Sequence, residues 1–244
     1  MSTNRADGSH DVPARIIPVP ETVSPQMQAI IGRPFDPAHI RVPETTEQWK
    51  ARVKVEADKT AAALPLLCKR LGVTVEPTSI NGVEAFTVTP DVIPSANRDR
   101  LLMHLHGGTR VRYPGLSGTR EAVLMAGFAG FKVISVDYRM PPDFPFPAAL
   151  DDAVTAYREI LKRAAPENIG VFGTSAGGSL TYTTLLRAKA EQLPMPGAIA
   201  TGTPTVDLSK IGDSLFTNAF VDNAIGTQDG FIRATWGHWT KTES

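Results

Sequence analysis

The sequence predicts an α/β fold built on a mainly parallel sheet with helices on both faces. Two segments of alternating polarity, Val73–Glu76 and Val83–Thr89, come first and indicate a pair of antiparallel strands. Asn81-Gly82 lies between them, and this dipeptide is typical of a tight hairpin turn. Farther along the chain, short apolar runs alternate with helical stretches, as in parallel strands joined by crossover helices.

The apolar runs after the hairpin have the length and composition of buried strands, and the stretches between them have the length of helices. The expected strands are Leu101–Leu105, Lys132–Val136, Ile169–Phe172 and Ala198–Thr201, and the expected helices are Glu121–Phe128, Ala148–Arg163 and Ala176–Glu191.

The chain before the hairpin has a different character. Roughly the first 43 residues are rich in proline, so we expect an extended arm with one short helix near Gln26–Ile31. A long helix is predicted over Thr46–Arg70, with Thr45 or Thr46 as its N-cap and Gly72 just past its end. Pro65 is expected to kink or split that helix.

Composition and charge limit the classes of partner. The 244 residues include 25 basic and 25 acidic side chains, so no excess of positive charge favours nucleic acid or an anionic membrane surface. Cys68 is the single cysteine, which excludes an intrachain disulfide and a cysteine metal cluster. No apolar run has the length of a signal peptide core or a membrane span, and we expect a soluble, cytoplasmic protein.

The segment NIGVFGTSAGGSL, residues 168–180, contains a G-x-S-x-G pentapeptide centred on Ser175. It follows a predicted strand and precedes a predicted helix, the context in which a serine projects from a tight strand-to-helix turn. Gly173 and Gly177 remove side chains that would collide in such a turn. The helix that follows directs the positive end of its dipole toward this point. Ser175 is therefore a candidate nucleophile.

The segment LMHLHGGT, residues 102–109, ends a predicted strand in His106-Gly107-Gly108. A glycine-rich turn at this place can supply backbone N–H groups to a developing oxyanion, although it also fits a simple tight exit from a strand. His104 is expected to be a packed core residue. A third segment, VDYRMPPDFPFPAALDD, residues 136–152, predicts a proline-stiffened loop that leads into a helix, with structural roles for Asp151 and Asp152.

In this order and spacing, the three segments resemble the hormone-sensitive-lipase-like family of esterases, over roughly residues 70–225. That family has an H-G-G-G loop, a Y-R-x-x-P-E-x-x-F-P-A-A-x-x-D segment and a G-D-S-A-G-G elbow. The resemblance implies an α/β-hydrolase fold with a helical cap and the cleavage of short-chain carboxylic esters, without metal or organic cofactor. It also implies a domain organisation: an N-terminal arm or cap (1–45), a cap helix (46–72), a partial hydrolase core (73–203), and a second cap segment with an irregular C-terminus (204–244).

Residue by residue, the resemblance makes Ser175 the nucleophile and the backbone N–H groups of Gly108, Thr109 and Ala176 the oxyanion hole. It also makes His106 a structural residue that holds the loop. Thr109 stands where the family has a third glycine, so its Cβ restricts the turn and crowds the acyl site. Thr174 replaces the usual aspartate of the elbow.

The acid and the base of the triad follow the serine in α/β hydrolases. His238 is the single histidine after Ser175, and Asp207 matches a family position that is not the triad acid. We therefore expect the chain to stop before its last strands and before the acid and base. The alternative is that His238 is a displaced base oriented by Asp222 or Asp229.

Two other functions stay open at this point. One is a non-catalytic hydrolase-fold module that binds a ligand or self-assembles, since an uncovered edge of a parallel sheet favours homo-oligomers. The other is a serine peptidase or amidase, because the elbow is shared across α/β hydrolases. The H-G-G loop and the Y-R-x-x-P segment favour the esterase and a small-molecule ester substrate.

Overall fold

The computed structural model describes residues 14–37, 40–209, 212–221 and 228–235. Its centre is a six-stranded sheet in the order β1-β2-β4-β3-β5-β6. The strands are β1 (Val73–Ile80), β2 (Val83–Pro90), β3 (Leu101–Leu105), β4 (Lys132–Val136), β5 (Ile169–Thr174) and β6 (Ala198–Gly202). Strands β4, β3, β5 and β6 are parallel, whereas β2 runs antiparallel to both β1 and β4. The predicted class is confirmed.

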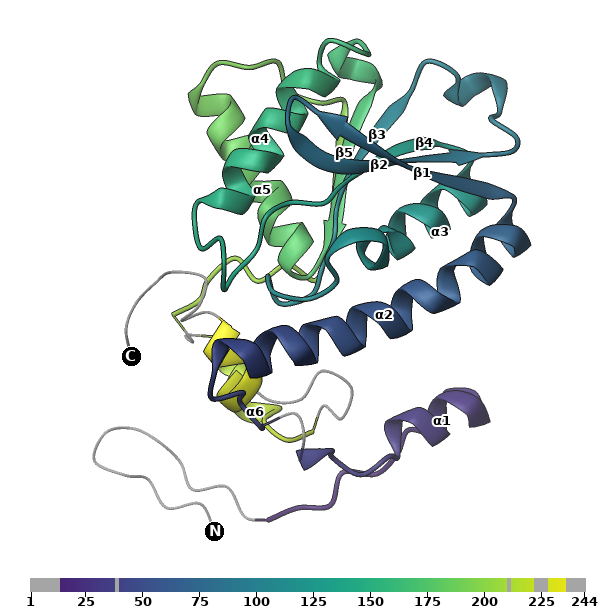
Figure 1. Ribbon diagram of the computed structural model, residues 1–244. Coiled ribbons are helices and arrows are strands. Elements are labelled where there is room, and N and C mark those ends of the chain that lie inside the picture. Colours follow the sequence, from purple (N-terminus) through teal and green to yellow (C-terminus); the bar gives the residue numbers. More distant parts are fainter. Residues whose placement is uncertain (1–13, 38–39, 210–211, 222–227, 236–244) are drawn as a thin grey trace.

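Helices cover both faces of the sheet (Figure 1). The helices are α1 (Pro25–Ile31), α2 (Thr46–Leu71), α3 (Arg120–Ala129), α4 (Ala148–Ile160), α5 (Ala176–Ala190) and α6 (Asp213–Thr217). Short 3₁₀ turns occupy Ser95–Asn97, Gly115–Thr119 and Pro166–Asn168, and a π-helical turn occupies Gln228–Ile232. Helices α4 and α5 share one apolar cluster with alternate residues of the strands, and α2 and α3 share another with the residues between them.

Short sequence signals determine where helix α2 begins and ends and where the hairpin between β1 and β2 turns. Thr45 caps α2, since its side chain accepts a hydrogen bond from the Gln48 N–H, and Gly72 ends the helix in the left-handed conformation at φ 61°. Asn81 and Gly82 have φ of 51° and 84°, as the predicted hairpin turn requires.

Two expectations about these elements are corrected. Helix α2 runs through Pro65 as one element, so the split that was one of the two expected outcomes does not occur. Strand β6 was expected to be buried, but it is the last strand of the sheet among the described residues, and Ile199 is 48% exposed. An apolar run marks a strand well, but its burial depends on the neighbours that the sheet supplies on its open side.

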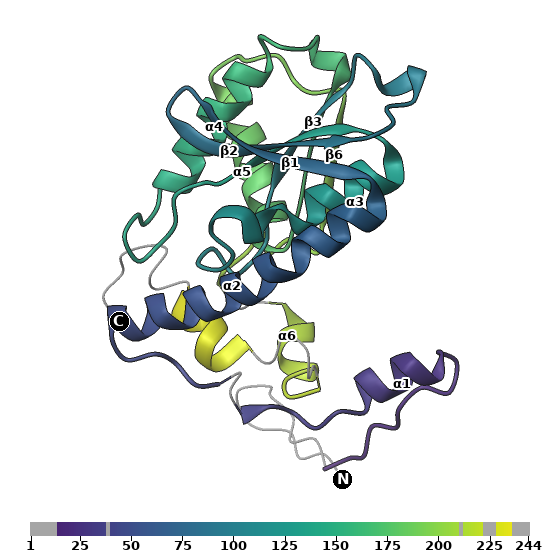
Figure 2. The ribbon, with the colours of Figure 1, turned by 45° about the vertical axis from the view of Figure 1, so that its right-hand side comes forward.

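The described parts of the N-terminal arm and of the chain after β6 lie on the same side of the core (Figure 2). Trp49 of α2 packs on Phe231 at a ring distance of 5.0 Å, and Phe35 meets Phe220 edge to face at 5.6 Å. Arg52 and Arg112 both lie over the Phe231 ring. These contacts support the proposal that the two ends of the chain form one cap. Among the described residues, none of the helices has the length and apolar character needed to cross a membrane.

Candidate active site

Ser175 lies at a sharp turn between β5 and α5. Its backbone has φ 56° and ψ −120°, a strained combination for a residue with a side chain. The Ser175 N–H donates to the Gly202 carbonyl at 2.7 Å, and the Ser175 carbonyl accepts from the Ser179 N–H at 3.0 Å. The turn is therefore held both by β6 and by the first turn of α5.

The glycines on either side of Ser175 are required by close packing against the end of β3. A Cβ on Gly173 would lie 2.2 Å from the Leu105 carbonyl oxygen, and one on Gly177 would lie 1.9 Å from the same atom. Neither position accepts a side chain without displacing backbone. The sequence spacing therefore reflects a geometric requirement of the turn.

The glycine-rich loop after β3 lies directly beside Ser175. A Cβ on Gly107 would lie 2.7 Å from the Thr174 carbonyl oxygen and 3.6 Å from the Ser175 Cβ. Three consecutive residues then have positive φ: Gly108 at 118°, Thr109 at 53° and Arg110 at 69°. This left-handed run brings the loop's backbone to the serine, and it is costly at Thr109 and Arg110, which carry side chains.

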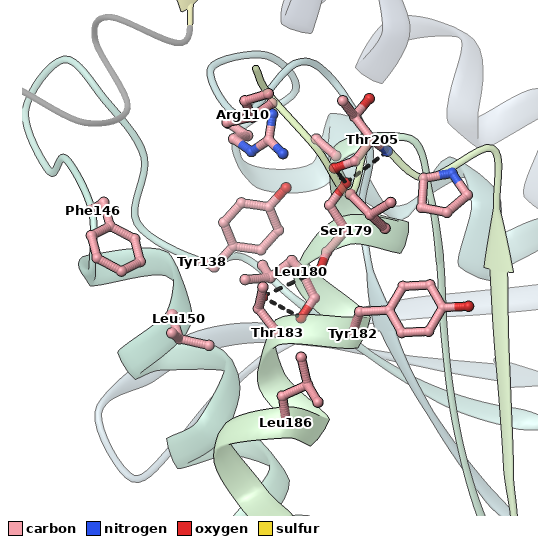
Figure 3. A pocket seen from close by; sticks show the side chains of 14 residues that line it. Arg110, Tyr138, Phe146, Leu150, Ser179, Leu180, Tyr182, Thr183, Leu186 and Thr205 are labelled. Atoms are coloured by element: carbon pink, nitrogen blue, oxygen red, sulfur yellow. Dashed lines mark hydrogen bonds between the residues drawn. The ribbon is translucent and has the colours of Figure 1, made fainter. Parts of the chain in front are cut away.

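Two cavities flank the serine. Ser175 itself lines one of about 320 Å³, together with Gly107, Gly108, Thr174 and Glu121. The other, of about 550 Å³, begins at Ala176, the first residue of α5. Figure 3 shows its mainly apolar wall, which includes Arg110, Tyr138, Phe146, Leu150, Leu180, Tyr182 and Leu186. Arg110 is the single charged side chain of this lining, and burial lowers its pKa.

His106 holds the glycine-rich loop. Its ring stacks on Tyr138 at 4.2 Å, its Nδ1 is 2.8 Å from the Gly107 carbonyl oxygen, and its own carbonyl accepts from the Tyr138 hydroxyl at 2.5 Å. Burial lowers the pKa of His106 to about 4, so the ring is neutral at pH 7. These contacts fit the structural role expected for this histidine.

His104 is fully buried, as expected of a core residue. Its Nδ1 lies 2.9 Å from the Ser135 Oγ, and its Nε2 lies 3.1 Å from the Glu121 Oε2. This serine–histidine–glutamate set resembles a triad in its connections, but the burial of His104 and Ser135 keeps it from substrate. Both histidines of the described residues thus have packing partners: His104 lies in the core, and His106 packs on Tyr138 in the lining of the cavity that it shares with Ser175.

The sequence profile of the alpha/beta hydrolase fold family matches residues 102–243, more than half of the chain. The chain belongs to this family. Among solved structures, the chain is similar to an esterase named E25, with 34% identity and a TM-score of 0.89 over 97% of this chain and 73% of that one.

The curated relatives that match this chain also have names that denote hydrolases of esters or lipids. The chain is 33% identical over 139 residues to an acetyl-hydrolase of Streptomyces hygroscopicus, and the match covers 57% of this chain and 46% of that protein. It is 32% identical over 133 residues to the hormone-sensitive lipase of Homo sapiens, which covers 52% of this chain and 12% of that protein. The chain therefore spans less than half the length of these curated relatives.

The structure places several of the predicted site residues close together. Ser175 and Gly108 line one cavity, and Ala176 follows Ser175 as the first residue of α5. Thr109 follows Gly108 in the loop after β3. His238 and Asp222 lie outside the described residues, as does the side chain of Asp229. Asp207 is exposed and accepts from the Ser209 N–H at 2.8 Å, which fits a local turn.

The two aspartates at the end of the proline-stiffened segment, Asp151 and Asp152, have the structural roles expected of them. Asp152 accepts from the Arg139 guanidinium and, at 2.8 Å, from the Arg139 N–H. Asp151 pairs with Arg187 of α5. The segment thereby places Tyr138 against His106.

The sequence did not indicate two residues at the candidate site, Glu121 and Arg110. Glu121 lies in the first turn of α3, where an acidic residue is ordinary, and its contacts with His104 and Thr174 span 17 and 53 residues of sequence. Arg110 belongs to none of the sequence motifs. The signal that could have indicated it is its position directly after Gly107-Gly108-Thr109.

Proposed function

We propose that this chain carries the nucleophile and oxyanion hole of a carboxylic-ester hydrolase that acts on short-chain acyl esters. The observation that carries the proposal is the strained backbone of Ser175 at the strand-to-helix turn, beside the glycine-rich loop at Gly107 and Gly108. Such strain persists only where the surrounding structure imposes it, and it is concentrated at functional sites. The names of the similar esterases point to the same chemistry.

In the proposed reaction, the Ser175 Oγ attacks the ester carbonyl carbon and its proton passes to an imidazole base. The N–H groups of Gly108, Thr109 and Ala176 stabilise the negative oxygen of the tetrahedral intermediate. The C–O bond to the alcohol then breaks, and the alcohol leaves with the proton from the base. Water, deprotonated by the same base, releases the acid and restores Ser175.

The histidine that accepts the proton of Ser175 has to be identified with variants. His104 and His106 are engaged in packing, and His238 is the one histidine that follows Ser175 in the sequence. We propose that a His238→Gln variant separates two cases. If this chain supplies its own base, turnover falls to the level of Ser175→Ala. If it does not, the low rate of this chain is the same with and without His238.

The substrate class follows from the walls of the two cavities. The apolar lining beside Ala176 is suited to a small acyl or alcohol group, and about 550 Å³ is ample for a short chain. p-Nitrophenyl acetate and butyrate are therefore the assay substrates. If this chain supplies its own base, we expect Ser175→Ala to remove at least a thousandfold of the turnover, since loss of a triad member costs up to about a millionfold.

Ser209→Ala is the matched control, because that serine is exposed and bonds only with its neighbour Asp207 among the described residues. It is expected to keep the wild-type rate. Equal rates for Ser175→Ala and the wild type would contradict the proposal. Parallel assays with p-nitroanilides test the peptidase or amidase alternative, which requires amide turnover comparable with ester turnover.

The non-catalytic alternative is favoured by one observation, the engagement of both described histidines in packing. It predicts at most one acylation of Ser175 per chain and no steady turnover. We also propose that the exposed edge of β6 pairs with another strand, which a second copy can supply. Light scattering after size-exclusion chromatography checks this, with Ile199→Lys expected to shift the protein toward the monomer. A wild type that is monomeric at all concentrations would contradict self-association.

A further inference from the structure

A chain of hydrogen bonds runs beneath the elbow, across the carboxyl ends of the central strands. Ser135 of β4 meets His104 of β3, which meets Glu121 of α3, and Glu121 accepts a hydrogen bond from the Thr174 hydroxyl at the end of β5. Thr174 immediately precedes Ser175. These hydrogen bonds therefore link α3 to Thr174, the residue directly before the turn at Ser175.

These residues share one face of the sheet. Ser135 pairs with His104 in the parallel register, and His104 pairs with Phe172, whose ring lies 4.8 Å away at an angle of 36°. Phe172 belongs to the apolar cluster beneath α2 and α3, and Thr174 lies two residues farther along the same strand. Glu121 is the member that reaches from a helix to the sheet, and it also lines the cavity of Ser175.

The carboxylate of Glu121 is suited to hold this position in its ionised form. Burial opposes its ionisation, but the hydrogen bond from His104 and that from Thr174 outweigh burial and lower the pKa of Glu121. An ionised carboxylate only accepts, so both neighbours donate to it. Hydrogen bonds to a charged acceptor are among the stronger ones in proteins.

Thr174 is held from two sides. Its hydroxyl is bound by Glu121, and it packs against β6, where a Cβ on Gly202 would lie 2.8 Å from the Thr174 Oγ1. The carbonyl of the same Gly202 accepts the Ser175 N–H at 2.7 Å. The Thr174 side chain and the Ser175 backbone thus both contact Gly202 of β6, and Glu121 holds Thr174 from the other element.

We propose that Glu121 is a positioning residue for the nucleophile, which acts by holding the Thr174 hydroxyl and so keeps Ser175 in its strained conformation. The inference rests on the proposed role of Ser175 as nucleophile. It also gives a reason for threonine at 174, where the resembled esterases carry aspartate: a second carboxylate beside Glu121 would repel it.

The test is a double-mutant cycle with Thr174→Val and Glu121→Met, both close in size to the native side chains. The readout is the second-order rate at which a fluorophosphonate labels Ser175, with Ser175→Ala as the blank. If Glu121 acts through Thr174, each single variant slows labelling about tenfold, the loss expected for one hydrogen bond to a charge. The double variant is then no slower than either single one.

Rescue distinguishes hydrogen bonding from bulk structure. In Glu121→Gln, the amide oxygen accepts from Thr174 and the amide NH₂ donates to His104, whose ring presents Nε2 as an acceptor in its other tautomer. We expect this variant to label at half the wild-type rate or faster. Glu159→Gln, which removes the half-buried partner of the exposed Lys162 near the end of α4, is the control and is expected to label at the wild-type rate.

Three results would overturn the inference: additive losses in the double variant, wild-type labelling in both single variants, or a Glu121→Gln variant as slow as Glu121→Met. Failure of the proposed function has a different signature, because the wild type then labels no faster than Ser175→Ala. In that case the melting temperatures of the same four proteins still measure whether Glu121 and Thr174 are coupled. Equal and non-additive shifts support the contact, and additive shifts refute it.

Discussion

Lowering the pH should weaken the fold through His106. Burial lowers the pKa of this ring from 6.5 to about 4, so the folded protein keeps it neutral while the unfolded chain protonates it. Between these two values the unfolded state binds more protons, and the stability therefore falls as the pH falls. The difference of about 2.5 pKa units corresponds to a loss of about 3 kcal/mol, at 1.36 kcal/mol per unit. Below about pH 4 this contribution is exhausted.

Urea unfolding at intervals from pH 7 to pH 4.5 measures this loss. Carboxylates begin to titrate toward the lower limit, so the slope above about pH 5.5, where they stay ionised in both states, is the part that reports on His106. The variant His106→Phe keeps an aromatic ring beside Tyr138 but does not titrate, so it is expected to be less stable at pH 7 and nearly independent of pH in this range.

Tyr138→Phe is the matched control. It removes the hydroxyl that donates to the His106 carbonyl at 2.5 Å but leaves the imidazole buried. It should lower the stability at every pH and keep the wild-type slope. The reasoning is refuted if His106→Phe has the same slope as the wild type, because the titrating group would then lie elsewhere.

Three further predictions concern the support of the site, and urea or thermal unfolding checks each of them. Gly177→Ala places a Cβ 1.9 Å from the Leu105 carbonyl oxygen and should cost about 3 kcal/mol or more, at the upper end for overpacking, or prevent folding; a melting temperature like that of the wild type would refute the close contact. Asp152→Asn weakens the paired hydrogen bonds from Arg139 and should cost about 1.5–3 kcal/mol, and a loss below 0.5 kcal/mol, as for an exposed ion pair, would contradict this. Thr109→Gly relieves a left-handed residue at φ 53° and should stabilise the fold by about 1 kcal/mol, whereas destabilisation would mean that the threonine side chain contributes more than the strain costs.

The parts of the fold that short-range signals determine were predictable from the sequence. Thr45, Gly72 and the Asn81-Gly82 turn each act within a few residues, and the structure has the helix ends and the hairpin that they predict. The strand β1 extends through Pro77, farther than predicted, because it lies at the edge of the sheet. A proline at an edge can direct its missing donor away from the ladder.

The side-chain contacts of the site were not predictable in the same way. The pair of Glu121 and Thr174 joins residues 53 positions apart, and the contact between Tyr138 and His106 joins residues 32 apart. No local pattern encodes such pairs, because they depend on which strands are neighbours and on the length of the loops between them. The resemblance of three motifs predicted where the nucleophile lies, but only the order of the strands shows what holds it.

The backbone strain at the site depends on the contacts that hold the strained residues in place. Ser175, Thr109 and Arg110 have left-handed backbone, which is roughly 1–3 kcal/mol costly at each residue, and they persist because buried hydrogen bonds and close glycine contacts oppose relaxation. A variant that removes one support releases strain at the site and therefore costs the fold less than the lost contact alone. The geometry at Ser175 should then fail before the fold does. Loss of labelling without matching loss of stability is the result that would distinguish support of the site from support of the core.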